Sequence, residues 1–246
     1  TTLLQLLQYD PEVIPQGSPG YGGGSGQPYA MYAFLKHMWS TGVFVDSYSR
    51  LQDLAKELSP GEGAPEVGRA GAAGGALAAL AVSTDSLAGQ QAGGAASTPL
   101  LARVYLKLGL WRWALVQNHM TEGKLAEILG YLKASTEVAH TWAKAWHNWA
   151  YFGVAALEFY QGRGDDAKAV QYVAPAVQGF FRSIALGQAA AGKRAGRGNS
   201  LTLQDILRLL TLWFSHGSNP DVQSALQEGF GHVSIDTWLK VIPQII

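Results

Sequence analysis

Large apolar side chains recur every three or four positions through most of this sequence, which is the spacing of an amphipathic α-helix. The run from Leu101 to Ala150 shows the pattern best, because its tryptophans at 142, 146 and 149 fall on one helical face. Alternation with a period of two, typical of strands, is nearly absent. The pattern predicts helices over residues 28–42, 46–60, 100–108, 122–138, 141–161, 167–186, 203–216, 220–230 and 235–245.

Capping and helix-breaking residues set several of these boundaries. Asp46 is a suitable N-cap for the second helix. Gly109 is expected to close the third helix, and a short helical turn then carries Trp111 and Trp113. Pro175 is expected to bend the helix that contains it, because it donates no backbone hydrogen bond.

Helices of this length joined by short turns pack as antiparallel hairpins, and a run of hairpins stacks into a superhelix. The step from Leu108 to Trp111 is similar to the Leu-Gly step of a tetratricopeptide helix, although the repeat period is irregular. The predicted helices outnumber those of a four-helix bundle, the alternative arrangement. The sequence therefore predicts an all-α protein, an α-solenoid of stacked helical hairpins of the tetratricopeptide or HEAT kind.

Three segments interrupt the helical pattern. Residues 15–27 are rich in Gly, Ser and Pro and form a flexible linker by composition. Residues 61–99 consist largely of Gly, Ala, Ser and Gln, which bury too little apolar surface to offset chain entropy. We expect them to be a disordered insert in which only 77–82 forms transient helix. Residues 187–200 are expected to form a third, basic loop.

Composition excludes several functional classes. The hydrophobic fraction of 48% and the eight tryptophans exclude wholesale disorder. The charged residues, 15% of the chain, balance to zero, so no global field favours nucleic acid or an anionic membrane, and an anion site must be a local cluster. The absence of cysteine excludes disulfides, thiolate metal sites and a cysteine nucleophile. Neither a signal peptide nor an apolar stretch of about 18 residues is found, so we expect no membrane span.

One motif approaches a known binding site without completing it. The stretch GQAAAGKR (187–194) is close to a phosphate-binding loop, but Arg194 stands where the Mg²⁺-binding hydroxyl belongs and a helix precedes it in place of a strand. We interpret it as a basic linker. No serine lies in a G-x-S-x-G turn. The tryptophan stripe at 142, 146 and 149 favours helix packing over base stacking, because no basic groove accompanies it.

Histidines and aspartates give no better candidate for metal binding or acid/base chemistry. His140 and His147 lie on or near one helix, without cysteine or paired carboxylates nearby. His147, between two tryptophans, is expected to be a core or interface histidine with one hydrogen-bonded nitrogen. Asp165 and Asp166 are adjacent in a loop, so their side chains point apart and suit solvent. The sequence thus predicts no catalytic residue and no metal site.

Four cationic residues form the strongest candidate site. Arg103 and Lys107 are four positions apart, on one face of a predicted helix. Lys144 lies on a helix expected to pack nearby, and Lys36 lies on the aromatic first helix. Four cations facing one groove repel each other unless a polyanion is bound. The alternative from spacing alone is that each side chain extends to solvent from an amphipathic helix.

Several stretches resemble the FAT domain of target-of-rapamycin (TOR) protein kinases in order and separation, and together they span most of the chain outside the Gly/Ala-rich segments. They are YAFLKHMW (32–39), LARVYLKLGLW (101–111), TWAKAWHNWA (141–150), APAVQGFFRSIAL (174–186), LQDILRLLTLWF (203–214) and IDTWLKVIPQII (235–246). The resemblance implies that residues 1–246 are part of one FAT-type helical-repeat domain, located before the rapamycin-binding and kinase domains of a large kinase. The Gly/Ala-rich residues 61–99 depart from the family, in which that region is Gln-rich helix.

The resemblance also implies a ligand and partners. FAT domains of this kind bind inositol hexakisphosphate in a pocket of Lys and Arg, and Lys36, Arg103, Lys107 and Lys144 fall on similar positions. Multiply charged phosphates accept charge-assisted hydrogen bonds that relieve repulsion among such cations. The implied partners are the kinase domain of the same chain and TOR complex subunits, with no nucleic acid. ATP and Mg²⁺ would belong to the kinase domain alone.

The implied function is a non-catalytic scaffold fragment of a cytoplasmic serine/threonine kinase in growth signalling, associated with membranes through complex partners. A free-standing tetratricopeptide-like adaptor that binds protein partners is the alternative function. An independent enzyme is disfavoured, because no converging nucleophile, base or metal set is visible in the sequence.

Overall fold

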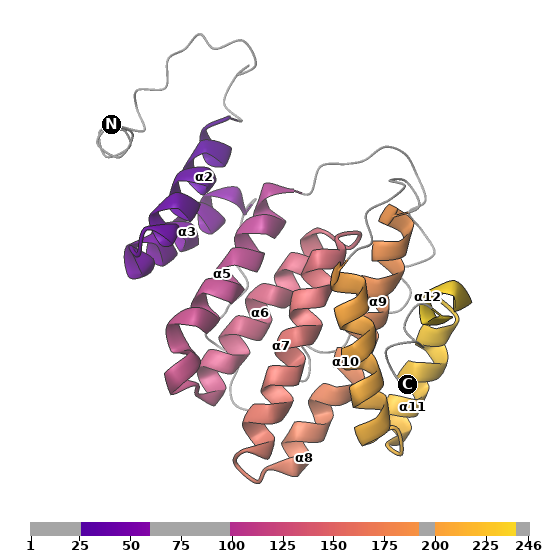
Figure 1. The fold of residues 1–246 in the computed structure, drawn as a ribbon. Coiled ribbons are helices and arrows are strands. Elements are labelled where there is room, and N and C mark those ends of the chain that lie inside the picture. The colour runs from indigo at the N-terminus through magenta and orange to yellow at the C-terminus, as the bar shows by residue number, and fades with distance from the viewer. Residues whose placement is uncertain (1–25, 60–98, 192–199, 240–246) are drawn as a thin grey trace. The chain divides into compact units, whose positions relative to one another are not determined.

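The computed structural model describes residues 26–59, 99–191 and 200–239, and every regular element within these ranges is helical (Figure 1). The α-helices are α2 (Gly26–Ser40), α3 (Phe44–Leu58), α5 (Leu100–Val116), α6 (Glu122–Val138), α7 (Ala143–Gln161), α8 (Asp166–Ala169), α9 (Val173–Ala191), α10 (Ser200–His216), α11 (Pro220–Phe230) and α12 (Ile235–Leu239). Two 3-10 turns, η2 (Gln117–His119) and η3 (Val170–Tyr172), lie between helices. The prediction of an all-α helical-repeat solenoid is confirmed. The described helices include none that is long and apolar enough to cross a bilayer.

The chain divides into two compact units, residues 1–64 and 65–246. In the N-terminal unit α2 and α3 pack as a hairpin. Gly42 makes the turn between them with a φ of 95°, a left-handed conformation that glycine adopts without steric penalty. Leu35 of α2 and Leu51 of α3 are fully buried. The predicted end of the first helix near Gly42 is therefore confirmed.

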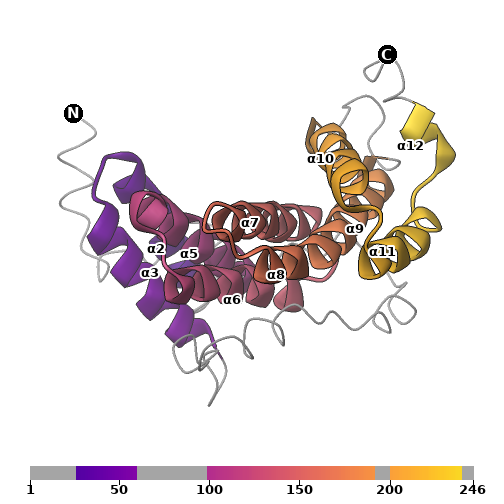
Figure 2. The same cartoon turned by 90° about the horizontal axis from the view of Figure 1, so that it is seen from below.

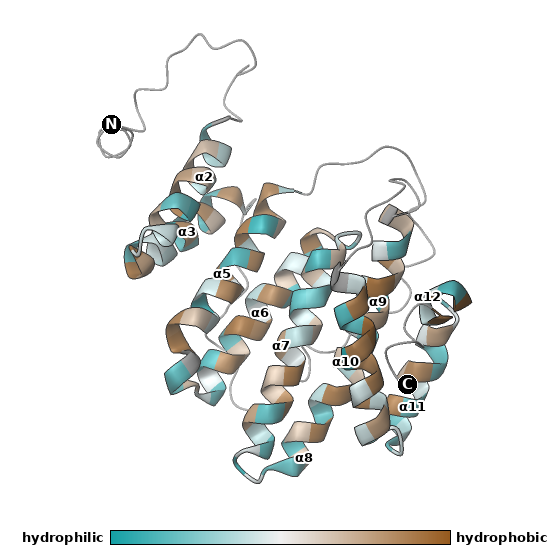
Figure 3. Cartoon of the chain, viewed as in Figure 1, coloured by the Kyte–Doolittle hydropathy of each residue, from teal (hydrophilic) through white to brown (hydrophobic). Residues whose placement is uncertain are grey.

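The C-terminal unit is a row of packed helices. α5 and α6 form a hairpin, α6 packs on α7, α7 packs on α9, and α9 contacts both α10 and α11. Figure 2, seen from below, shows α7 on one side of the row and α6 and α11 on the other. Figure 3 shows apolar and polar residues mixed along α5, α6 and α7, as expected for amphipathic helices. Because each inner helix packs on a neighbour at either side, one continuous core runs through the unit.

Glycines allow the closest helix–helix contacts in this core. A Cβ added at Gly179 of α9 would lie 2.8 Å from Cε3 of Trp149 on α7. A Cβ added at Gly109 of α5 would lie 2.7 Å from Cδ2 of Leu132 on α6. The prediction that Gly109 closes a helix is therefore wrong, since α5 continues through it to Val116. The interhelical packing gained at Gly109 outweighs the unfavourable helix propensity of glycine.

Two other predicted boundaries also need correction. Asp46 is not the N-cap of the second helix, because α3 begins at Phe44 after Val43. Asp46 lies in the first turn and forms an exposed ion pair with Arg50 at 3.1 Å. Pro175 does not bend a helix, because it lies in the first turn of α9, where a missing N–H leaves no bond unmade. The expected helix over 167–186 is instead divided into α8, η3 and α9, with the division before the proline.

The predicted non-helical segments are only partly described. The structure corrects the basic loop over 187–200, because α9 continues to Ala191 and α10 begins at Ser200. It also corrects the linker over 15–27, since α2 begins at Gly26. The remainder of these segments, with 60–98 and the end of the expected helix over 235–245, lies outside the described residues, and only Pro99 of the predicted insert is described.

Candidate anion-binding site

Three of the four predicted site cations belong to the C-terminal unit. Arg103 lies in the first turn of α5, Lys107 lies one turn further along, and both side chains are half-buried. Lys144 is the second residue of α7 and is exposed. Because α6 runs back between α5 and α7 through short connections, the N-termini of α5 and α7 lie on the same side of the row of helices (Figure 1). The fold thus places Arg103 and Lys144 on the side of the unit where α5 and α7 begin.

One buried and one part-buried hydrogen bond fix the backbone beside these cations. The hydroxyl of Ser135 on α6 donates to the carbonyl of Ala102 at 2.8 Å, which joins α6 to the first turn of α5. The indole Nε1 of Trp146 donates to the carbonyl of His140 at 2.8 Å, which holds the connection before α7. Each bond lies within two or three residues of a predicted site cation, so the backbone is held where Arg103 and Lys144 emerge.

Lys36 belongs to the N-terminal unit. Its side chain is exposed on α2, and its ammonium nitrogen lies 5.0 Å from the centre of the Tyr32 ring, one turn earlier. This cation–π contact is worth about 0.5–1 kcal/mol at an exposed site. A cavity shared by Lys36 and the other three cations stays a prediction.

The structure also contains a buried polar cluster that the sequence interpretation did not identify. Asp205 of α10 is fully buried, and its carboxylate accepts a hydrogen bond from Ser183 of α9 at 2.6 Å. Its second oxygen lies 2.5 Å from Nδ1 of His147 on α7. His147 is thus a core histidine with a hydrogen-bonded nitrogen, as predicted. The position of Asp205 in the apolar stripe of Leu209 and Leu212 was the available indication of its burial.

Serine, histidine and aspartate meet in this cluster, but their arrangement differs from a catalytic triad. Both Ser183 and His147 bond the carboxylate of Asp205, whereas a nucleophilic serine must donate to the histidine that acts as its base. His147 and Ser183 are also more than nine-tenths buried as whole residues, which leaves little room for a substrate beside them. The cluster therefore joins α7, α9 and α10 as a structural unit.

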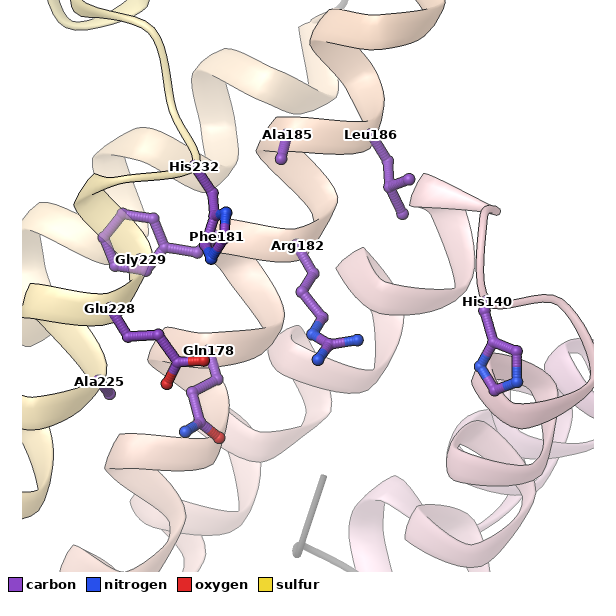
Figure 4. Close-up of a pocket in the computed structure, with 10 residues that line it drawn as sticks. All are labelled: His140, Gln178, Phe181, Arg182, Ala185, Leu186, Ala225, Glu228, Gly229 and His232. Carbon is purple, nitrogen blue, oxygen red and sulfur yellow. The ribbon is translucent and has the colours of Figure 1, made fainter. Parts of the chain in front are cut away.

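Arg182 of α9 is a further cation that the sequence interpretation missed. Its guanidinium lies 4.8 Å from the centre of the Trp146 ring, and burial lowers its pKa, while the charge of Glu228 acts in the opposite direction. Arg182 forms part of an open pocket of about 200 Å³. Figure 4 shows it between Glu228 and Gln178 on one side and His140 on the other. Its position among the apolar residues of α9 gave no indication of this pocket.

The other candidates from the sequence have structural roles. Asp165 caps α8 by accepting from the backbone N–H of Lys168 at 3.1 Å, and Asp166 beside it is exposed. Trp146 and Trp149 are buried in the core, which confirms the packing interpretation of the tryptophan stripe. Residues 187–191 of the approximate phosphate loop are helical. Within the described ranges no group of three His, Asp or Glu side chains is arranged to hold a metal ion.

Comparison with known proteins identifies a matching family model and relatives that are much longer than this chain. The family model described as the FAT domain matches residues 1–211. The chain is 43% identical over 249 aligned residues to the serine/threonine-protein kinase TOR of Arabidopsis thaliana and 39% identical to that of Oryza sativa subsp. japonica. It is 35% identical over 223 residues to the serine/threonine-protein kinase tor1 of Schizosaccharomyces pombe. The two plant matches include 100% of this chain and the third 89%, but the chain spans only 8–9% of the length of these curated relatives.

Proposed function

We propose that this chain, which belongs to the FAT domain family, supports the kinase domain of a TOR-type serine/threonine protein kinase and holds inositol hexakisphosphate as a structural anion. Its own role in that kinase is non-catalytic. The single observation that supports the proposal is that α5 and α7, the helices that carry Arg103 and Lys144, begin on the same side of a helical scaffold whose sequence matches TOR kinases.

The packing supports the scaffold part of the proposal. Phe152 of α7, Phe180 of α9 and Leu209 of α10 are buried in one core that continues into α11. Fully burying each such side chain contributes roughly 1.5–3 kcal/mol relative to leaving it exposed. Because the core is continuous from α5 to α11, these helices pack as one compact unit. Such an arm is suited to hold a neighbouring domain in a fixed position.

The placement of the cations supports the anion part. Arg103, Lys107 and Lys144 lie in the first two turns of two parallel helices, whose N-termini add partial positive charge at the same end. A ring with several phosphates offers charge-assisted hydrogen bonds to more than one cation, whereas a single carboxylate offers only one anionic group. The half-burial of Arg103 and Lys107 reduces solvent screening, which strengthens each charge–phosphate contact. Lys36 is the fourth proposed contributor, and this assignment depends on the family resemblance.

The remaining roles follow from membership of a longer kinase. ATP and Mg²⁺ would bind the kinase domain, and this segment would contact that domain and the subunits of a TOR complex. The parent protein would act in the cytoplasm and reach membranes through its complex partners. The described helices contribute packing surfaces and cations to this assembly, while phosphoryl transfer would be performed by residues of the kinase domain.

Thermal unfolding of the parent protein tests the anion site. Inositol hexakisphosphate is expected to raise the Tm, because a ligand that binds only the folded state stabilises it. In the double variant Lys107→Glu/Lys144→Glu the shift should disappear. Lys124→Glu/Arg163→Glu is the matched control, since it makes the same change in charge at two cations near the start of α6 and the end of α7, the opposite ends of the helices from the proposed site. An equal shift in all three proteins would remove the assignment of this site.

A further inference from the structure

Among the described residues, the side chain of Arg182 has fewer polar partners than a partly buried cation normally has. It is half-buried on α9, and burial lowers its pKa. Within the described residues no hydrogen bond or ion pair to its guanidinium is found, and its contact is the face of Trp146 at 4.8 Å. A guanidinium carries five N–H donors in a planar arrangement, so it can hold an anionic group that enters the pocket. This arrangement is typical of a group that receives an anionic ligand.

The surroundings of Arg182 restrict the chemistry of that ligand. Apolar atoms of Phe181, Ala185, Leu186 and Ala225 make up much of the pocket wall. The pocket volume of about 200 Å³ admits a small group and no folded domain. An apolar wall with one cation suits a ligand that is apolar at one end and anionic at the other.

The formal charges of the lining residues further restrict the number of negative charges on the ligand. The carboxylate of Glu228 also lines the pocket, so the formal charges of Arg182 and Glu228 cancel. A pocket of this kind does not concentrate a polyanion, in contrast to the cluster of Arg103, Lys107 and Lys144. It can still hold one carboxylate on the planar edge of the guanidinium. In Figure 4 the side facing His140 lies away from Glu228, and the carboxylate is expected there.

We propose that this pocket binds a single carboxylate carried on an aromatic or aliphatic group, with Arg182 as the anchor. The guanidinium lies over the ring of Trp146, and the indole Nε1 of Trp146 donates to the carbonyl of His140. The apolar group of the ligand contacts Phe181 and Leu186. The ligand is either a free carboxylic acid or an acidic side chain beside an aromatic residue in a partner peptide.

Titration of the 246-residue chain, followed through the side-chain Nε–H signal of Arg182 in ¹⁵N NMR spectra, tests this proposal. The probes are 3-phenylpropionate, its neutral amide, acetate and a blocked Phe-Glu dipeptide. We expect 3-phenylpropionate to shift the Arg182 signal in a saturable way, with Kd on the order of 1 mM. The amide lacks the charge and acetate lacks the apolar group, so both should bind at least about tenfold more weakly. Tighter binding of the dipeptide than of 3-phenylpropionate assigns the site to a partner peptide, and the reverse assigns it to a free acid.

Variants separate the role of Arg182 from a general effect of charge. Binding followed by ligand-observed NMR should be lost in Arg182→Gln and reduced in Arg182→Lys, which keeps the charge without the planar fork. Arg163→Gln is the matched control, because Arg163 also stacks on an aromatic ring, at 4.2 Å from the centre of Phe159, but does not line the pocket. Equal binding of the acid and the amide to the unchanged protein would overturn the proposal even if Arg182→Gln failed to fold. Unchanged binding to a folded Arg182→Gln variant would also overturn it.

Discussion

Nδ1 of His147 on α7 lies 2.5 Å from the carboxylate of Asp205 on α10, 58 positions later in the chain. This contact joins the two helices across α9, whose Ser183 donates to the other oxygen of the same carboxylate. The carboxylate is fully buried, so both bonds form away from water. The C-terminal unit is thus stabilised by a polar cluster as well as by its apolar core.

Replacing Asp205 by alanine is expected to lower the free energy of unfolding by about 3–5 kcal/mol, because His147 and Ser183 lose their partner in a buried site. Urea denaturation of the 246-residue chain measures this change. Ser183→Ala should cost less, roughly 1–2 kcal/mol, since the carboxylate keeps its histidine. Gln204→Ala, at an exposed position beside Asp205, is the control and should leave stability nearly unchanged. An Asp205→Ala variant as stable as this control would contradict the role of the cluster.

Gly179→Ala is expected to destabilise the contact between α7 and α9 by about 1–3 kcal/mol, because the added Cβ would lie 2.8 Å from the ring of Trp149. Gly123→Ala is its matched control within α6, where no atom lies within 4 Å of the added Cβ. That change should stabilise the protein by about 0.4–1 kcal/mol through the unfolded state. Denaturation midpoints of the two variants should therefore move in opposite directions, and a shared direction would refute the packing argument.

Tyr172 is expected to make stability fall at alkaline pH. Burial is the main cause that raises the pKa of its hydroxyl, and the neighbouring Tyr160 raises it further. The folded state therefore retains a proton that the unfolded chain releases, so this contribution is complete below the ordinary tyrosine pKa of about 10 and decreases as pH rises above it. Tyr172→Phe should make the decrease less steep in unfolding measurements between about pH 9 and 11. Tyr29→Phe, at an exposed side chain, is the control, and equal slopes in both variants would contradict the prediction.

Trp146→Phe is expected to lower the free energy of unfolding by roughly 1–3 kcal/mol, because the carbonyl of His140 loses its donor in a part-buried site. Phenylalanine keeps an aromatic face beneath Arg182, so the substitution tests the hydrogen bond more than the cation–π contact. Thermal unfolding measures the change. Trp213→Phe, at a partly exposed indole, is the comparison, and a larger loss there would argue against a special role for the Trp146 bond.

Helix boundaries were predictable where local chemistry sets them. The helix over 122–138 was predicted at its observed bounds, and Thr121 accepts a hydrogen bond from the backbone of Lys124 at its start. The helix over 220–230 was equally well predicted, because Asn219 caps it and Pro220 occupies its first position. In both cases the residues that define the start of the helix are its immediate neighbours in the sequence.

Boundaries set by distant contacts were not predictable. Gly109 was interpreted as a helix end because its helix propensity is unfavourable, but the contact with Leu132 that favours glycine there depends on α6. The pocket around Arg182 also brings together the connection before α7 with α9 and α11, which lie far apart in the sequence. The cations Arg103 and Lys107 were grouped by spacing, whereas the common end of α5 and α7 follows from the order of short connections.

The central claim is that Arg103, Lys107 and Lys144 surround one polyphosphate anion on this scaffold. The most direct test is a cryo-EM map of the parent kinase, purified with inositol hexakisphosphate, at a resolution that shows side chains. We predict density for the phosphate groups on the side of the row where α5 and α7 begin, within hydrogen-bonding distance of all three cations. The account is contradicted if the three side chains point to different faces of the row with no phosphate density between them.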